Sequence, residues 1–184
     1  MPSEFASRAG EKLEHALLQF KISVVRKVCA DFGSSTGGFV DCLLQRGAKK
    51  VYAIETGYGT LDWKLRNDAR VVVMERTNAL HAELPELMDF ISIDVSWTPQ
   101  KLILPQALKF LKDSGDIVSL LKPHYEADKK WLKAGKIQDE FIDLAIEKVK
   151  SELKELGIEI KEITKSPIVG KKGGNPEFLI WIKK

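Results

Sequence analysis

Residues 28–39 have the sequence Val28-Cys29-Ala30-Asp31-Phe32-Gly33-Ser34-Ser35-Thr36-Gly37-Gly38-Phe39. The apolar start predicts a short buried strand, and the glycine-rich part predicts a loop that leads into a helix. Glycines lack a Cβ atom, so this loop can turn sharply and approach a ligand closely. A dinucleotide fingerprint would need glycine where the chain has Ser35, and a triphosphate loop would need lysine where it has Phe39. The segment matches neither phosphate-binding loop, and the simplest alternative is an ordinary strand-to-helix turn.

The remaining pattern, D-x-G-x-x-x-G-G-F, resembles the S-adenosylmethionine loop of class I methyltransferases. The resemblance implies that the loop holds this cofactor, with contacts from Asp31, Gly33, Ser34, Ser35, Thr36, Gly37, Gly38 and Phe39. A second apolar run ends at Glu55, about 20 residues past the glycines, where an acid can accept both ribose hydroxyl groups. Asn78, after a third apolar run, is a candidate to contact the adenine amino group. Each has a structural alternative, since Glu55 can be a plain turn residue and Asn78 can cap a turn.

Apolar strand patterns alternate with helical patterns along most of the chain. We expect strands at 28–32, 50–54, 71–74, 89–94 and 116–121, and helices at 7–20, 39–45, 61–66, 100–112 and 138–156. Strands that are apolar on both faces are typical of a parallel sheet covered on both sides. Two last strands, 158–164 and 177–182, are joined without a helix and predict a hairpin. The fold class is therefore α/β, a mostly parallel seven-stranded sheet with a C-terminal antiparallel hairpin, which resembles the Rossmann-like class I methyltransferases.

Length and composition limit the possible classes of protein. With 184 residues and 44% hydrophobic content, the chain is expected to form a single domain over residues 1–184. No apolar run approaches the ~20 residues that cross a bilayer, and the first residues lack the blocks of a signal peptide, so we expect a cytoplasmic protein without membrane partners. Cys29 and Cys42 are expected to be free thiols, and no cluster of ligands predicts a metal.

Positive charge is concentrated in two segments. Residues 122–136 carry five lysines and two acids, a net charge of +3, and residues 165–175 carry three lysines and no acid. Such a distribution suits a polyanionic substrate. Solvated lysines on loops are the alternative.

Several longer motifs together resemble the TlyA family of FtsJ-like RNA methyltransferases. They are Ser7-Arg8-Ala9-Gly10-Glu11-Lys12-Leu13, Asp31 to Phe39, Gly57-Tyr58-Gly59, Leu61 to Arg66, Glu75-Arg76-Thr77-Asn78, Ile93-Asp94-Val95-Ser96, Leu121-Lys122-Pro123 and Asn175-Pro176-Glu177-Phe178-Leu179. The resemblance implies S-adenosylmethionine-dependent 2′-O-methylation of ribose in ribosomal RNA, free or in a ribosomal subunit. It also implies a catalytic tetrad, which falls here on Lys12, Asp94, Lys122 and Glu177. Candidate RNA contacts are Arg8, Lys129, Lys130, Lys133, Lys171 and Lys172.

The chain departs from the family pattern at two places. Family members usually carry a small RNA-binding domain before the Ser7-Arg8 segment, and this sequence starts almost there, so we expect a separate RNA-binding domain or protein to add affinity. The segment before Glu177 also carries an additional glycine and a proline. The family has been described as haemolysins too, which makes a membrane-active protein one alternative. A methyltransferase for small molecules is another, against which the basic segments argue.

Overall fold

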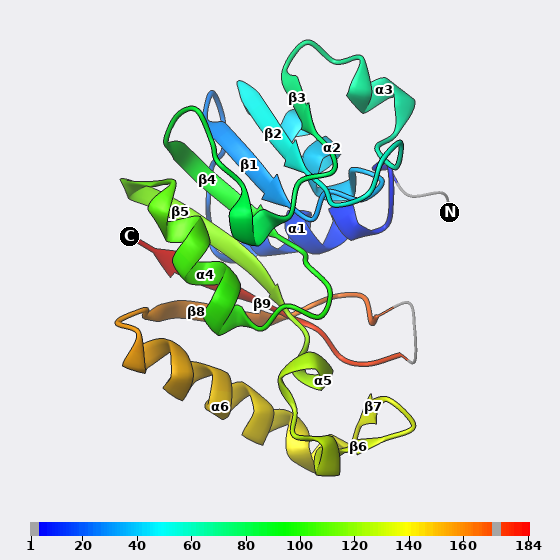
Figure 1. The fold of residues 1–184 in the computed structure, drawn as a ribbon, viewed down its shortest axis with the longest axis vertical. Coiled ribbons are helices and arrows are strands. Elements are labelled where there is room, and N and C mark those ends of the chain that lie inside the picture. The colour runs from blue at the N-terminus through cyan, green and yellow to red at the C-terminus, as the bar shows by residue number, and fades with distance from the viewer. Residues whose placement is uncertain (1–3, 171–173) are drawn as a thin grey trace.

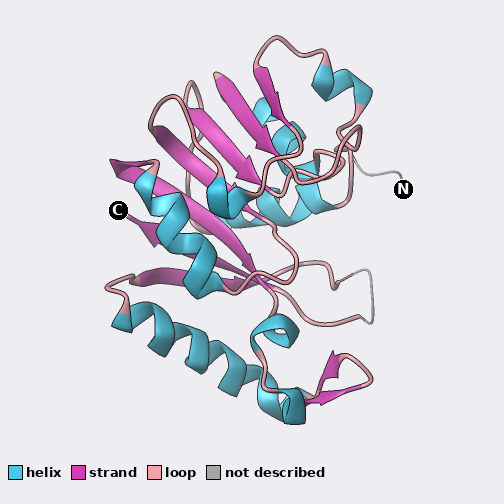
Figure 2. Ribbon diagram, viewed as in Figure 1, coloured by secondary structure: helices cyan, strands magenta, loops and turns pink. Residues whose placement is uncertain are grey.

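Seven strands form one sheet in the order β3-β2-β1-β4-β5-β9-β8 in the computed structural model, which describes residues 4–170 and 174–184 (Figures 1 and 2). The strands β1 to β5 are mutually parallel, and β9 pairs antiparallel with both β5 and β8. The strand bounds are Val28–Phe32 (β1), Lys50–Ile54 (β2), Val71–Met74 (β3), Met88–Ile93 (β4), Leu111–Leu121 (β5), Ile160–Lys165 (β8) and Phe178–Lys183 (β9). This arrangement confirms the predicted fold class.

Helices cover both faces of the sheet (Figure 1). They are α1 (Ala9–Gln19), α2 (Gly38–Gln45), α3 (Trp63–Arg66), α4 (Gln100–Lys109), α5 (Pro123–Glu126) and α6 (Ile142–Glu155). Successive side chains of a strand point to opposite faces. Cys29 accordingly packs with α1 and α2, whereas Ala30 packs with α4 and α6. Two apolar cores therefore hold one central sheet rigidly between two helical layers.

Some predicted bounds were wrong where polar residues interrupt the patterns. Strand β5 begins at Leu111, five residues before the predicted start, and α4 consequently ends at Lys109. Helix α6 begins at Ile142, after a 3-10 turn at Asp139–Phe141. The basic segment expected to be a loop contains α5, a second 3-10 turn at Lys129–Trp131, and a small hairpin of β6 (Leu132–Lys133) and β7 (Lys136–Ile137). Lys171 and Lys172 lie outside the described residues.

Candidate active site

The proposed functional side chains gather at the carboxyl ends of the parallel strands. Gly33 follows β1, Glu55 follows β2, Asp94 follows β4 and Lys122 follows β5. In open α/β sheets this edge is where ligands bind. A cavity of about 480 Å³ opens there, lined by Gly33, Ser35, Ile54, Glu55, Thr56, Thr77, Asn78, Ala79, Leu80, Asp94, Val95, Ser96, Trp97, Thr98 and Ile103.

Gly33 brings the glycine loop against the end of β4. Its φ is +90°, and a Cβ atom at this position would lie 2.5 Å from the backbone oxygen of Asp94. The backbone amides of Gly33 and Ser34 both donate to the Ile54 carbonyl, at 2.9 and 3.0 Å. Only glycine fits this close approach, which leaves the backbone exposed at the floor of the cavity.

Glu55 joins the glycine loop to the turn after β2. Its Oε2 accepts the Ser35 amide at 2.8 Å, and its Oε1 accepts the Gly57 amide at 2.8 Å. Burial opposes ionisation of this carboxyl, but the hydrogen bonds from Gly57, Ser35 and Thr56 outweigh burial and lower its pKa. Glu55 is therefore an anionic hydrogen-bond acceptor on the wall of the cavity at neutral pH.

Asp31 lies beneath the loop as a buried carboxyl group with 1% of its surface exposed. Ser92 Oγ donates to its Oδ1 at 2.7 Å, and its Oδ2 has no partner among the described residues. Desolvation raises its pKa to about 8 against the lowering effect of the Ser92 hydrogen bond, with a further increase from Asp94 and Glu55. Burial therefore favours the neutral, protonated form of the Asp31 carboxyl group.

The other predicted loop residues divide between the cavity and the core. Ser35 and Asn78 line the cavity, and Asn78 Oδ1 also accepts the Leu80 amide at 3.0 Å, so it caps a short 3-10 turn at Ala79–His81. Phe39 is buried in the core between α1 and α2, and Gly38 packs against Ser7 and Gly10. Neither Phe39 nor Gly38 lines the cavity, and the same holds for Ser34, Thr36 and Gly37.

Two ion pairs bring the four tetrad candidates to the same end of the sheet. Lys122 Nζ lies 2.5 Å from Asp94 Oδ1 and also donates to the Val95 carbonyl at 3.2 Å. Lys12 Nζ lies 2.5 Å from Glu177 Oε2. The β5–β9 register pairs Leu121 with Phe178, so Lys122 and Glu177 are the next residues beyond the last pair of these two strands. The two ion pairs are consequently neighbours on adjacent strand ends.

The Lys12–Glu177 pair is buried, with only 6% and 4% of the two residues exposed. A buried charge is costly unless it is paired, so each of the two residues holds its partner in place. Lys12 reaches this position from α1, and Glu177 precedes β9. The ion pair thereby fixes helix α1 to the start of β9, the last strand in the chain.

Trp97 and Tyr125 stand beside the candidate tetrad, and sequence reasoning missed them. Trp97 is 81% exposed, has an unusual φ of +62°, and contacts Tyr125 with the ring centroids 4.7 Å apart and the ring planes tilted by 31°. Lys122 Nζ lies 5.7 Å from the centre of the Tyr125 ring. Each aromatic residue follows a tetrad candidate by three positions, which was the signal available in the sequence.

The basic candidates that the structure describes lie outside the cavity. Lys129, Lys130 and Lys133 are exposed on the segment that carries the β6–β7 hairpin. Arg8 donates to the Val169 carbonyl at 3.4 Å and so connects the start of α1 to the segment before β9.

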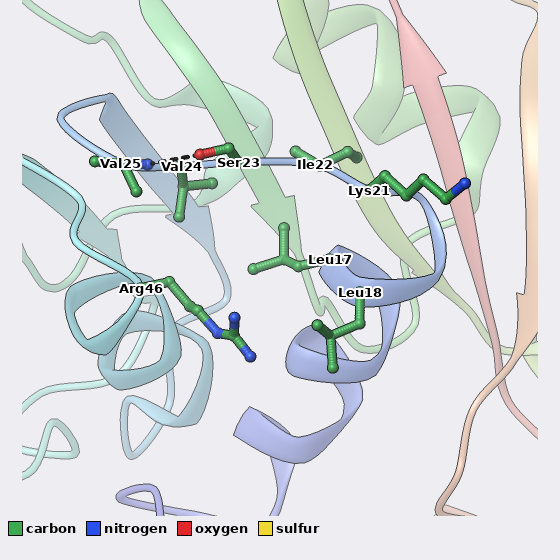
Figure 3. Close-up of a pocket in the computed structure, with 8 residues that line it drawn as sticks. All are labelled: Leu17, Leu18, Lys21, Ile22, Ser23, Val24, Val25 and Arg46. Carbon is green, nitrogen blue, oxygen red and sulfur yellow. Dashed lines mark hydrogen bonds between the residues drawn. The ribbon is translucent and has the colours of Figure 1, made fainter.

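A second cavity of about 360 Å³ lies between the end of α1 and the segment that leads into β1 (Figure 3). It is lined by Leu17, Leu18, Lys21, Ile22, Ser23, Val24, Val25 and Arg46, none of which is a predicted site residue. Within residues 4–170 and 174–184, no group of three metal-ligating side chains could hold a metal ion. Over the same part of the chain, no helix is long and apolar enough to cross a membrane.

A doubly wound sheet closed by an antiparallel strand pair, with a glycine loop and an acid at the ends of β1 and β2, defines a Rossmann-like methyltransferase. A solved S-adenosylmethionine-dependent methyltransferase from Mesorhizobium loti shares the fold, with a TM-score of 0.70 at 13% identity. The model of the family described as FtsJ-like methyltransferase matches residues 5–184. The chain belongs to this family.

Relatives from several bacteria cover nearly the whole chain. TlyA of Mycobacterium tuberculosis, named as a 16S/23S rRNA (cytidine-2′-O)-methyltransferase, is 37% identical over 97% of this chain and 68% of its own length. Hemolysin A of Brachyspira hyodysenteriae is 43% identical over 96% of this chain and 75% of its own. A solved protein from Streptococcus thermophilus superimposes with a TM-score of 0.94 at 41% identity, over 100% of this chain and 68% of that one. The chain thus spans about two thirds to three quarters of the length of these relatives.

Proposed function

We propose that this chain is an S-adenosylmethionine-dependent 2′-O-ribose methyltransferase that acts on ribosomal RNA. The observation that carries the proposal is the pairing of Lys122 with Asp94 and of Lys12 with Glu177 on adjacent strand ends, with Asp94 also lining the cavity at the glycine loop. Family membership and the name of the TlyA relative support the reaction and the substrate.

The residues around the cavity fit the cofactor. Gly33 keeps the floor open to a ligand, and Glu55 presents carboxylate oxygens suited to ribose hydroxyl groups. Asp31 does not line the cavity but lies beneath the glycine loop, with a buried oxygen that lacks a partner among the described residues. When bound, S-adenosylmethionine supplies an electrophilic methyl group. Because no triphosphate or dinucleotide pattern is present, phosphate binding plays no part in this site.

Lys122 is our candidate general base for the ribose hydroxyl, which is a poor nucleophile until its proton moves: the neutral amine of Lys122 would take that proton as the methyl group passes from the cofactor sulfur to the ribose oxygen. Asp94 holds the Lys122 amine in place through the 2.5 Å contact. Lys12 and Glu177 present a donor and an acceptor that can hold the ribose. The adjoining rings of Trp97 and Tyr125, which are tilted by 31° to each other, offer an exposed aromatic surface for the base of the same nucleotide.

The exposed lysines near β6–β7 supply contacts to phosphates of the RNA backbone. We further propose that residues 1–184 act as one methyltransferase domain and that a separate RNA-binding domain or protein adds affinity. The same proposal places the enzyme in the cytoplasm, where it meets ribosomal RNA.

The test is transfer of a labelled methyl group to purified ribosomal subunits and to naked ribosomal RNA, followed by mapping of the modified ribose. Lys122→Ala and Lys122→Arg should each slow transfer at least about 100-fold, because general acid–base groups contribute roughly that much, while cofactor binding stays nearly intact. Arginine is always charged and differently shaped, so it cannot take the proton. Lys154→Ala and Lys154→Arg, at an exposed position on α6, serve as controls. Near-normal transfer by Lys122→Arg would show that Lys122 supplies only charge.

A further inference from the structure

Asn175 links the β6–β7 hairpin to the segment that leads into Glu177. Its side chain is buried, with 2% of the residue exposed. Its Oδ1 accepts the backbone amide of Ile137 at 3.0 Å, and its Nδ2 donates to the Gly135 carbonyl at 3.3 Å. Both partners belong to the β6–β7 hairpin, which is 38 to 40 residues away in sequence.

The hairpin that Asn175 holds is small and basic. Ala134 and Gly135 form its turn with positive φ angles of 49° and 76°, as a two-residue hairpin turn requires. Lys133 and Lys136 flank the turn and are exposed, and neither forms an ion pair with any residue that the structure describes. Two strands of two residues have little stability of their own, so the position of the hairpin depends on contacts such as those of Asn175.

On its other side, Asn175 belongs to the segment that positions Glu177. The Asn175 carbonyl accepts the Gly170 amide at 2.9 Å, and the Glu177 carbonyl accepts the Ser166 amide at 2.9 Å. Gly170 itself packs closely against the carboxylate, because a Cβ atom there would lie 3.0 Å from Glu177 Oε1. The backbone on both sides of the carboxylate is therefore fixed by short contacts, one of which comes from Asn175.

We infer that Asn175 is a positioning residue that couples the basic hairpin to Glu177. The inference rests on the proposed function, in which Glu177 and Lys12 hold the ribose. When Lys133 and Lys136 contact phosphates of the RNA, the hairpin takes a defined position, and the two side-chain hydrogen bonds of Asn175 pass that constraint to the Glu177 backbone. RNA that lacks this contact binds with a less ordered Glu177.

Amide hydrogen exchange without RNA tests the physical link. Asn175→Ala should speed exchange of the Ile137 amide, whose acceptor is removed, and of the Ser166 amide, whose acceptor is the Glu177 carbonyl. Asn175→Asp keeps the acceptor for Ile137 but turns a buried carboxylate oxygen toward the Gly135 carbonyl, so it should also speed exchange of the Ile137 amide. Asn67→Ala is the control, because Asn67 is exposed and donates only within α3 and its flank, to the Trp63 carbonyl. Faster exchange at Ile137 with no change at Ser166 would overturn the coupling.

Single-turnover methyl transfer to ribosomal RNA tests the catalytic consequence. Asn175→Ala should lower the rate at saturating RNA about tenfold or more, by removing two hydrogen bonds to a buried group, and change the RNA concentration for half-maximal rate less than about threefold. The double variant with Lys133→Ala and Lys136→Ala should lower the rate at saturating RNA and raise the RNA concentration for half-maximal rate when Asn175 is present. When Asn175 is already replaced by alanine, the same two lysine substitutions should raise only the RNA concentration for half-maximal rate.

If the fold loss in rate at saturating RNA in the combined variant equals the product of the losses from Asn175→Ala and from the two lysine substitutions, the inference is overturned, because coupled residues give non-additive effects. An unchanged rate in Asn175→Ala would overturn it too. Thermal melts of each variant establish that it is folded. If the wild-type chain transfers no methyl group to ribosomal RNA, the proposed function fails, whereas the exchange experiment still decides whether the hairpin and Glu177 are linked.

Discussion

Asp31 combines a buried position with an ionisable group, and this has a consequence for stability. The folded state raises its pKa to about 8, whereas an unfolded chain holds aspartate near the ordinary value of about 3.9. Below about pH 4 Asp31 is protonated in both the folded and the unfolded state, so its ionisation does not change the free energy of unfolding. As pH rises toward 8, the unfolded state gains by ionising while the folded state does not, so this residue destabilises the fold progressively.

We therefore expect Asp31→Asn to raise the free energy of unfolding relative to wild type, by an amount that grows from pH 5 to pH 8. Asparagine keeps an acceptor for Ser92 and has no proton to lose. Urea denaturation of both proteins across this range measures the difference, and the other titrating groups cancel in the comparison. A constant stability difference between pH 5 and pH 8 would contradict the assignment.

Glu55 supports the structure of the glycine loop and is also our proposed contact to the cofactor ribose. Glu55→Ala removes a charged acceptor and should weaken S-adenosylmethionine binding roughly ten- to hundredfold, since a hydrogen bond to a charged group contributes about 1.5 to 3 kcal/mol. Glu55→Gln should also weaken binding, because both carboxylate oxygens accept backbone N–H groups and an amide would set one donor against another. Calorimetry with Glu83→Ala, at an exposed position, as the control measures this. An unchanged affinity in Glu55→Ala would remove Glu55 from the site.

The basic segment that carries the 3-10 turn at Lys129–Trp131 and the β6–β7 hairpin is the part of the chain on which RNA affinity should depend. If about four lysines contact phosphates, the logarithm of affinity should fall with the logarithm of salt concentration with a slope near −3 to −4. Replacing Lys129, Lys130 and Lys133 by alanine should reduce the size of this slope by about 2 to 3. The control replaces the exposed Lys49, Lys154 and Lys161, which changes the net charge equally. Equal slopes for the two triple variants would locate the RNA elsewhere.

The sequence predicted elements well where an apolar run ends at a turn residue. The bounds of β1, β2 and β3 agree because Gly33, Glu55 and Glu75 each follow a short, mainly apolar segment. Strand β5 was predicted too short because Lys112, Asp113, Ser114 and Gly115 interrupt its pattern. The β6–β7 hairpin was missed because its strands are too short to show a period, and its Ala134-Gly135 turn lacks the usual Asn-Gly or Asp-Gly signal.

In the candidate site, too, the sequence predicted local features well and contacts between distant residues poorly. The glycine loop and Glu55 are local features, so their spacing was informative. The ion pairs Lys12–Glu177 and Lys122–Asp94 span 165 and 28 residues, and their positions came from the family resemblance and not from any local pattern. The contact of Asn175 with the hairpin is equally non-local. It depends on how β9 enters the sheet beside β5, which no period in the sequence reports.

At the scale of the whole molecule, the site exists only when all layers are assembled. Its side chains come from α1 and from the ends of β1, β2, β4, β5 and β9. The buried Lys12–Glu177 pair closes this arrangement between the first helix and the last strand. Two apolar cores lie on opposite faces of the same central strands, so neither helical layer can leave without exposing the apolar face of the sheet that it covers.

This interdependence predicts the outcome of a membrane test, which the relative named Hemolysin A makes pertinent. The apolar side chains of α1, Leu13, Ala16 and Leu17, are buried in the core, and inserting this helix into a bilayer would first expose them together with the strand residues they cover. Each large side chain contributes about 1.5 to 3 kcal/mol through its burial, which opposes such a release.

We therefore expect no dye release from anionic lipid vesicles, with or without S-adenosylmethionine, at protein concentrations that are sufficient for complete methyl transfer to ribosomal RNA. A lytic amphipathic peptide is the positive control for leakage, and methyl transfer by the same preparation establishes that the protein is folded. The Lys122→Ala variant separates the two activities, because it should lose transfer and still release no dye. Release by the folded wild type that persists in Lys122→Ala would establish a membrane activity independent of the methyltransferase site.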